Sequence, residues 1–124
     1  MGPTPIYNLI LEERDEYLYA RVTSETIDGE SALQYLTEIA NRCEEIDCER
    51  LMIYREIPVM LSDGVLFMVS AEFQKMITGI RTAFVNPYEP NKEAFDFALT
   101  VGENRGAEYA LFTNEEEAEA WLVG

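Results

Sequence analysis

Ser62, Asp63 and Gly64 are the residues of this chain whose types and spacing could carry chemistry, because they interrupt its most apolar stretch, residues 57–69. A serine hydroxyl can accept a phosphoryl group, and a hydroxyl beside a carboxylate can contact a small ligand. Pro58 rules out a continuous strand or helix here, since proline lacks an N–H and keeps the preceding residue extended. Asp63 and Gly64 are turn residues, and a helical pattern follows them. We therefore predict a loop from a strand end to a helix start, a junction where α/β proteins place their sites.

A simpler interpretation of Ser62 and Asp63 is helix capping. Serine and aspartate are favoured at helix N-termini, where their side-chain oxygens accept hydrogen bonds from free backbone N–H groups. Capping alone is the favoured interpretation on this ground. A phosphoacceptor and a ligand contact are the functional alternatives.

The charge of the chain excludes several classes of function. Among 124 residues there are 24 acids, nine bases and no histidine, for a net charge of −15. Such a field repels nucleic-acid phosphates and anionic lipid surfaces. Without histidine, Ser-His-Asp and Cys-His triads are excluded and the commonest transition-metal ligand is missing. No enclosed acid pair and no glycine-rich phosphate loop is present either. We predict a non-enzymatic protein that binds no nucleic acid, metal or cofactor.

The remaining composition favours one cytoplasmic domain of bacterial type, residues 1–124. No apolar stretch is long enough to span a bilayer. Residues 1–5 show no signal-peptide pattern, and we expect them to form a disordered or extended tail. Cys43 and Cys48 are too few for a zinc site. Two reduced thiols are favoured, with a disulfide as the alternative.

Periodic apolar residues divide the chain into strands and helices. Two strand-like segments joined by a short polar turn predict an antiparallel hairpin, and the later strands alternate with helices. Helix caps are predicted at Ser31, Asn91 and Thr113, and helix ends at Gly79 and Gly106. The predicted strands span residues 6–12, 17–23, 50–54, 80–85 and 108–112, and the predicted helices follow Ser31, Gly64, Asn91 and Thr113.

The predicted order of elements is β-β-α-β-α-β-α-β-α. Strand–helix–strand units favour parallel pairing with right-handed crossovers. The fold class is therefore α/β, with a mostly parallel five-stranded sheet, an antiparallel N-terminal strand and four helices.

This order, together with residues 81–85, 104–106 and 111–122, resembles a STAS domain, the fold of bacterial anti-anti-sigma factors and of sulphate-transporter tails. The chain is most similar to small stand-alone STAS-like proteins, which relate structurally to CRAL-TRIO lipid-binding domains. In the anti-anti-sigma branch the phosphoacceptor serine lies in an Asp-Ser-Ser/Thr-Gly pattern that opens the second helix. Ser62 falls on the acceptor position and Gly64 matches, but Leu61 replaces the acid and Asp63 replaces the hydroxyl residue.

The resemblance implies a regulatory or protein-interaction module of STAS type. The alternative is a binder or sensor of a small, lipid-like apolar ligand in a pocket around residues 57–73, lined by Met60, Leu61, Phe67 and Met68. Three further residues could contact an anion, although packing is the favoured role for them: Tyr54, Arg81 and Arg105.

Phe67 and Met68 fall outside the apolar stripe of the predicted second helix. That stripe consists of Leu66, Val69, Phe73, Met76 and Ile77. An aromatic residue and a methionine together are typical of a contact surface, and we predict self-association through this helix, as a two-fold homodimer. The alternative is that residues 57–61 fold over both side chains and bury them.

Overall fold

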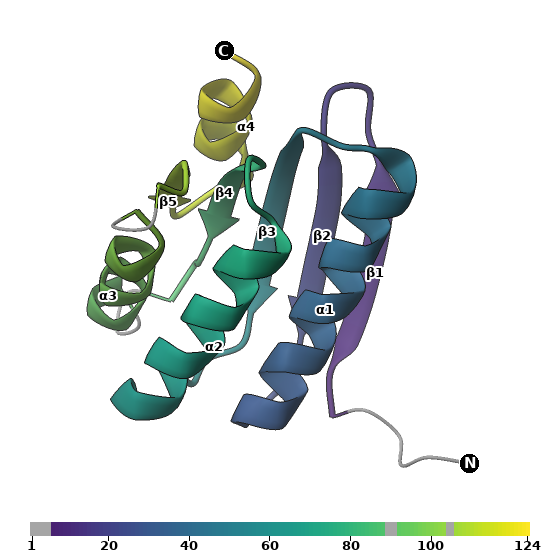
Figure 1. Ribbon diagram of the computed structural model, residues 1–124. Coiled ribbons are helices and arrows are strands. Elements are labelled where there is room, and N and C mark those ends of the chain that lie inside the picture. Colours follow the sequence, from purple (N-terminus) through teal and green to yellow (C-terminus); the bar gives the residue numbers. More distant parts are fainter. Residues whose placement is uncertain (1–5, 89–91, 104–105) are drawn as a thin grey trace.

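The computed structural model describes residues 6–88, 92–103 and 106–124, which form a five-stranded sheet and four helices (Figure 1). The order of elements is β1 (Asn8–Glu13), β2 (Leu18–Thr23), α1 (Gly29–Ile46), β3 (Arg50–Glu56), α2 (Asp63–Met76), β4 (Arg81–Val85), α3 (Lys92–Glu103), β5 (Tyr109–Phe112) and α4 (Glu115–Val123). This is the predicted order, and every predicted strand overlaps an observed one. The predicted tail, residues 1–5, and the predicted cap Asn91 lie outside the described residues.

The strands lie in the order β1-β2-β3-β4-β5. β1 is antiparallel to β2, and the other three pairs are parallel, which confirms the predicted fold class. The N–H of Arg14 donates to the carbonyl of Tyr17 at 3.0 Å and closes the predicted hairpin. Because β2, β3 and β4 run in parallel, α1 and α2 both begin near the carboxyl ends of these strands.

The alternating side chains of the inner strands fill two separate cores. On β2, Leu18, Ala20 and Val22 are fully buried against residues of α1 and α2. Tyr17 and Tyr19, which point the other way, pack with residues of α4. Successive side chains of any strand point to opposite faces, so a strand with helices on both sides has both sets of side chains buried.

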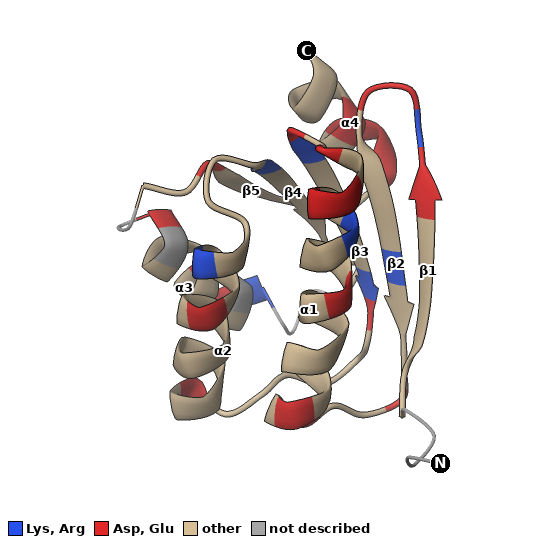
Figure 2. Cartoon of the chain, turned by 45° about the vertical axis from the view of Figure 1, so that its right-hand side comes forward, with Lys and Arg blue, Asp and Glu red and all other residues tan. Residues whose placement is uncertain are grey.

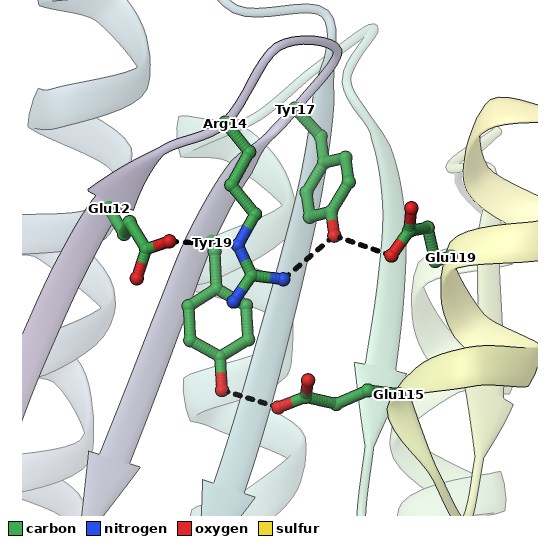
Figure 3. Close-up of polar contacts among 6 residues, drawn as sticks. All are labelled: Glu12, Arg14, Tyr17, Tyr19, Glu115 and Glu119. Carbon is green, nitrogen blue, oxygen red and sulfur yellow. Dashed lines mark hydrogen bonds and ion pairs between the residues drawn. The ribbon is translucent and has the colours of Figure 1, made fainter.

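Two tyrosines of the hairpin hold α4 on its face of the sheet (Figure 3). The Tyr19 hydroxyl donates to Glu115 Oε1 at 2.6 Å, and the Tyr17 hydroxyl donates to Glu119 Oε2 at 3.2 Å. Arg14 donates to the Tyr17 hydroxyl at 2.8 Å and lies 3.8 Å from the centre of the Tyr19 ring. Burial and the bond to Glu115 raise the pKa of Tyr19 to about 12.

Two predicted helix caps are wrong, one by three residues and the other by one. Asp28, rather than Ser31, caps α1, and its carboxylate accepts from the Ser31 N–H at 2.8 Å. Asn114, rather than Thr113, caps α4. Each segment holds two residue types that favour caps, and the packing of the helix decides which of them takes the extended backbone.

Gly79 and Gly106, predicted as helix ends, both have the left-handed backbone, with φ of 83° and 88°. Helix α2 itself ends slightly earlier than predicted, with Ile77 as its C-cap. Helix α1 ends instead at Asp47, whose φ is 55°. The next N–H, of Cys48, donates to the carbonyl of Cys43 at 3.0 Å. Both cysteines are free thiols, and the hydrogen bond with Cys48 and burial raise the pKa of Cys43.

No helix in the described part of the chain is long and apolar enough to cross a membrane. Among the same residues, no three acids or cysteines gather as a metal site would require.

Replacing the cap of α1 should destabilise the protein, whereas replacing the serine that the sequence favoured should not. Asp28→Ala leaves the Ser31 N–H without its acceptor and should lower the free energy of unfolding by about 1 kcal/mol. Ser31→Ala is the matched control and should change it by less than about 0.5 kcal/mol. Urea denaturation measures both, and an equal loss in the two variants would contradict the assignment of the cap.

Stability should fall in alkaline solution as Tyr19 ionises. The pKa of Tyr19 is raised from 10.0 to about 12 in the folded protein, so its contribution is complete below pH 10 and is lost as the pH rises towards 12. Urea denaturation at a series of pH values should show a smaller loss over this interval in Tyr19→Phe than in the wild type. The same loss in both proteins would show that the ionisation of Tyr19 does not contribute to the loss of stability.

Candidate functional site

The candidate site lies where β3 ends and α2 begins (Figure 1). Ser62 occupies the N-cap position of α2 with an extended backbone, and its carbonyl accepts the first helical hydrogen bond from the Leu66 N–H at 2.8 Å. Asp63 and Gly64 are the first two residues of the helix. All three site residues are exposed, as an apolar loop with a polar tip predicts.

The Ser62 hydroxyl makes no capping hydrogen bond. This distinguishes Ser62 from Asp28 and Asn114, whose side chains do accept bonds from their helices. Side-chain capping therefore does not account for the serine. Its hydroxyl is left at the surface, where an enzyme or a partner can reach it.

Gly64 has no steric role, because a Cβ placed on it would meet no atom within 4 Å. At Gly29 the situation is different, since a Cβ there would lie 2.7 Å from Cγ1 of Val65. This close approach brings the first turn of α1 against the first turn of α2. The candidate site is thus bordered by two helix N-termini, which carry the exposed acids Asp28 and Asp63.

Arg55 positions the loop that leads to Ser62. It lies on the side of β3 that faces α1 and α2, and it is only 5% exposed. Its Nη1 donates to the carbonyl of Ile57 at 2.8 Å, and its Nη2 donates to the carbonyl of Val59 at 2.6 Å. These bonds supply donors to two carbonyls beyond the end of the strand and fix the path of residues 57–59.

Arg55 is not among the residues predicted for the site from the sequence, although the sequence holds a signal for it. Leu51, Ile53, Arg55 and Ile57 alternate along one face of the strand, so an arginine stands in a row of otherwise buried positions. A charged residue in such a row must find buried acceptors.

The predicted apolar residues separate into two groups. Met60 and Leu61 are partly buried and line a cavity of about 70 Å³ between α1, α2, α3 and the sheet. Phe67 and Met68 lie on the outer side of α2 and are 46% and 57% exposed. Val59 in the loop is 41% exposed, so residues 57–61 do not fold over the two side chains of α2.

The size of the cavity bears on the predicted lipid-like ligand. An apolar cavity of roughly 150 Å³ holds one benzene molecule. The cavity beneath α2, at about 70 Å³, is too small for an acyl chain unless the helices move apart.

The residues predicted as alternative anion contacts have packing roles where they are described. Arg81 pairs with Glu108 at 2.7 Å, and its guanidinium carbon lies 3.9 Å from the centre of the Trp121 ring. Arg81 is the first residue of β4, at the opposite end of the parallel strands from Ser62. Tyr54 lies under Arg21, 4.9 Å from its guanidinium carbon. Arg105 lies outside the described residues.

The fold of this chain is similar to that of solved anti-sigma factor antagonists. An anti-sigma factor antagonist from Mycobacterium paratuberculosis superposes with a TM-score of 0.61 over 100% of both chains, at 12% sequence identity. The antagonist SpoIIAA in its unphosphorylated form gives a TM-score of 0.57 over 94% of this chain and 99% of the other, at 16% identity. The Bacillus cell fate determinant SpoIIAA in the phosphorylated form also gives 0.57, over 92% and 98%, at 19% identity.

These likenesses confirm the predicted STAS-like fold. No protein-family model and no curated protein matches the sequence. The comparisons give no support to a lipid-like ligand.

Removing the guanidinium of Arg55 should loosen the loop before Ser62. Arg55→Met keeps an apolar stem but removes the two N–H donors that bind the carbonyls of Ile57 and Val59, and should lower the free energy of unfolding by about 1–3 kcal/mol. Amide hydrogen exchange should accelerate in residues 57–61, while urea denaturation measures the stability. The matched control, Arg50→Met on the same strand, should leave the exchange of that loop unchanged, and equal acceleration in both variants would contradict the role of Arg55.

Proposed function

We propose that this chain is a non-enzymatic regulatory module, resident in the bacterial cytoplasm, that binds a protein partner at the start of α2. We further propose that phosphorylation of Ser62 controls this binding. The observation that carries the proposal is the exposed hydroxyl of Ser62, which makes no capping hydrogen bond to α2. Exposed apolar side chains lie close to Ser62 along the chain. The solved structures of similar fold are named as anti-sigma factor antagonists, and one of them is described in both phosphorylated and unphosphorylated forms, which supports a role of this kind.

The partner surface proposed here consists of Val59, Ser62, Phe67 and Met68. Its three apolar members are each more than 40% exposed, and they flank Ser62 along the chain. Aromatic residues and methionine are enriched in protein interfaces. Lys75 pairs with Glu72 at 3.2 Å farther along the same helix, so part of this helix is locally neutral in a chain of net charge −15.

A phosphoryl group on Ser62 would change this surface strongly. It would add nearly two negative charges at a helix N-terminus, where backbone N–H groups favour an anion. It would also lie next to Asp63 and beside apolar side chains that a partner must desolvate. We therefore propose that the phosphorylated form binds the partner more weakly.

The test begins with a partner captured from the host on the wild-type protein and then purified. Ser62→Ala should bind this partner as the wild type does, whereas Ser62→Glu and Phe67→Glu should each weaken binding about tenfold or more. Isothermal titration gives the dissociation constants. Mass spectrometry of protein from the host should find the phosphoryl group on the peptide that contains Ser62.

Two matched controls separate a local effect from added charge. Thr78→Glu places a carboxylate beyond the other end of α2, and Phe97→Glu replaces a phenylalanine on α3 that is 44% exposed. Both should bind as the wild type does. If Ser62→Glu and Phe67→Glu bind no more weakly than these controls, the proposed surface is wrong.

Self-association is the other role predicted for Phe67 and Met68. Light scattering on Phe67→Glu tests it in the same set of proteins, because a contact between two α2 helices would be lost in that variant. We assign the surface to a different protein, since the likeness in fold is to antagonists of anti-sigma factors.

A further inference from the structure

The outer edge of β1 offers unpaired backbone groups to another strand. β1 is the first strand of the sheet, and in the described residues it pairs with β2 alone (Figure 1). Arg14 and Tyr17 form a hydrogen-bonded pair at the hairpin, and such pairs alternate along an antiparallel ladder. With the observed register, the next bonded pairs are Glu12 with Tyr19 and Ile10 with Arg21.

The N–H and carbonyl groups of the intervening residues, Leu9 and Leu11, must therefore point away from β2. They form the free edge of the sheet. The register between β1 and β2 runs from Asn8 to Glu13 without a bulge, and the strand contains no proline. Bulges and prolines are common means of blocking edge strands, and this edge lacks both.

The side chains at the centre of this edge are apolar. Ile10 lies on the face that α4 only partly covers and is 50% exposed. Leu9 and Leu11 lie on the other face and are only partly buried against the core. An added strand would complete the burial of all three.

The charges of β1 are confined to one end (Figure 2). Glu12 and Glu13 end the strand, whereas Asn8 to Leu11 carry no charge. A parallel neighbour of the same sequence would align these acids with their own copies. An antiparallel neighbour would separate them to opposite ends, so the charge pattern fits a second copy in one orientation.

We propose that a second copy of this chain pairs antiparallel with β1 across a two-fold axis, with Ile10 facing its own copy at the centre. In this register Ile10 is a non-hydrogen-bonded pair, in which side chains approach most closely. Leu9 exchanges backbone hydrogen bonds with Leu11 of the second copy, and Leu11 with its Leu9. Glu12 lies opposite an uncharged Asn8, so no like charges face each other.

This arrangement joins two sheets edge to edge and leaves the α2 surface free for a different protein. The net charge of −15 on each copy opposes association over the whole molecule. Salt screens this repulsion but hardly affects the apolar and backbone contacts of the edge. The dimer should therefore strengthen as sodium chloride is added.

Light scattering of the purified full chain, from micromolar to millimolar concentration and at low and high sodium chloride, tests the proposal. The mass should rise from 14.2 kDa towards twice that value, and at lower concentration in high salt. Ile10→Lys places two like charges together at the centre and should remain monomeric. Phe67→Lys makes the same kind of change at an exposed site on α2 and should dimerise as the wild type does.

Amide hydrogen exchange gives a second measure that does not depend on a variant. The amides of Leu9 and Leu11 should exchange rapidly in dilute protein and become protected as the concentration rises. The Ile10 amide, which bonds within the hairpin, should be protected at every concentration.

Several outcomes would overturn the proposal. A monomer under all conditions would do so, as would a wild-type dimer whose Leu9 and Leu11 amides stay unprotected. A dimer that survives Ile10→Lys and is lost in Phe67→Lys would assign self-association to α2 instead.

Discussion

Burial of β3 on both faces is the constraint on which the rest of the structure depends. β3 is the middle strand of the sheet, and Leu51, Met52 and Ile53 are all between 0 and 2% exposed. A strand in this position needs helices on both sides, because neither face can be left to water. One face is covered by α1 and α2, and α4 packs against the other. The parallel pairing with β2 and β4 follows from the crossovers that α1 and α2 form.

The site depends on how this buried strand ends. The period of two that buries Leu51 and Ile53 also turns Arg55 inward. Burying a guanidinium costs free energy unless acceptors are supplied, and here the chain supplies its own carbonyls just past the strand. The buried charge of Arg55 is thus satisfied by the same hydrogen bonds that fix the loop. The same loop carries Ser62 to the surface with its hydroxyl unused by the helix.

Charge and apolar surface together shape how this molecule can meet others. With 24 acids and nine bases, general attraction between copies is ruled out, so contact must come where charge is locally low. The exposed apolar side chains Phe67 and Met68 on α2 and Ile10 at the centre of β1 offer contacts of this kind in the described residues. The α2 surface offers side chains only, while β1 offers side chains and a row of backbone groups. This difference is the reason for assigning them different partners.

The sequence by itself determined the order of elements, the hairpin and the place of the polar tip at residues 62–64, because these depend on local periodicity and on the preferences of proline and glycine. It also determined that the chain resembles a STAS domain. The cap positions were predicted only to within a few residues, since Asp28 and Ser31 have similar preferences and the packing of the helix chooses between them.

Only the tertiary structure decided which helix covers which face, that Arg55 points inward and clamps the loop, and that Phe67 and Met68 remain exposed. It also decided that the cavity beside Met60 and Leu61 is small. Periodicity shows that a strand or a helix has two faces, but the neighbour that covers each face is set by contacts between residues far apart in the chain, which no local pattern records.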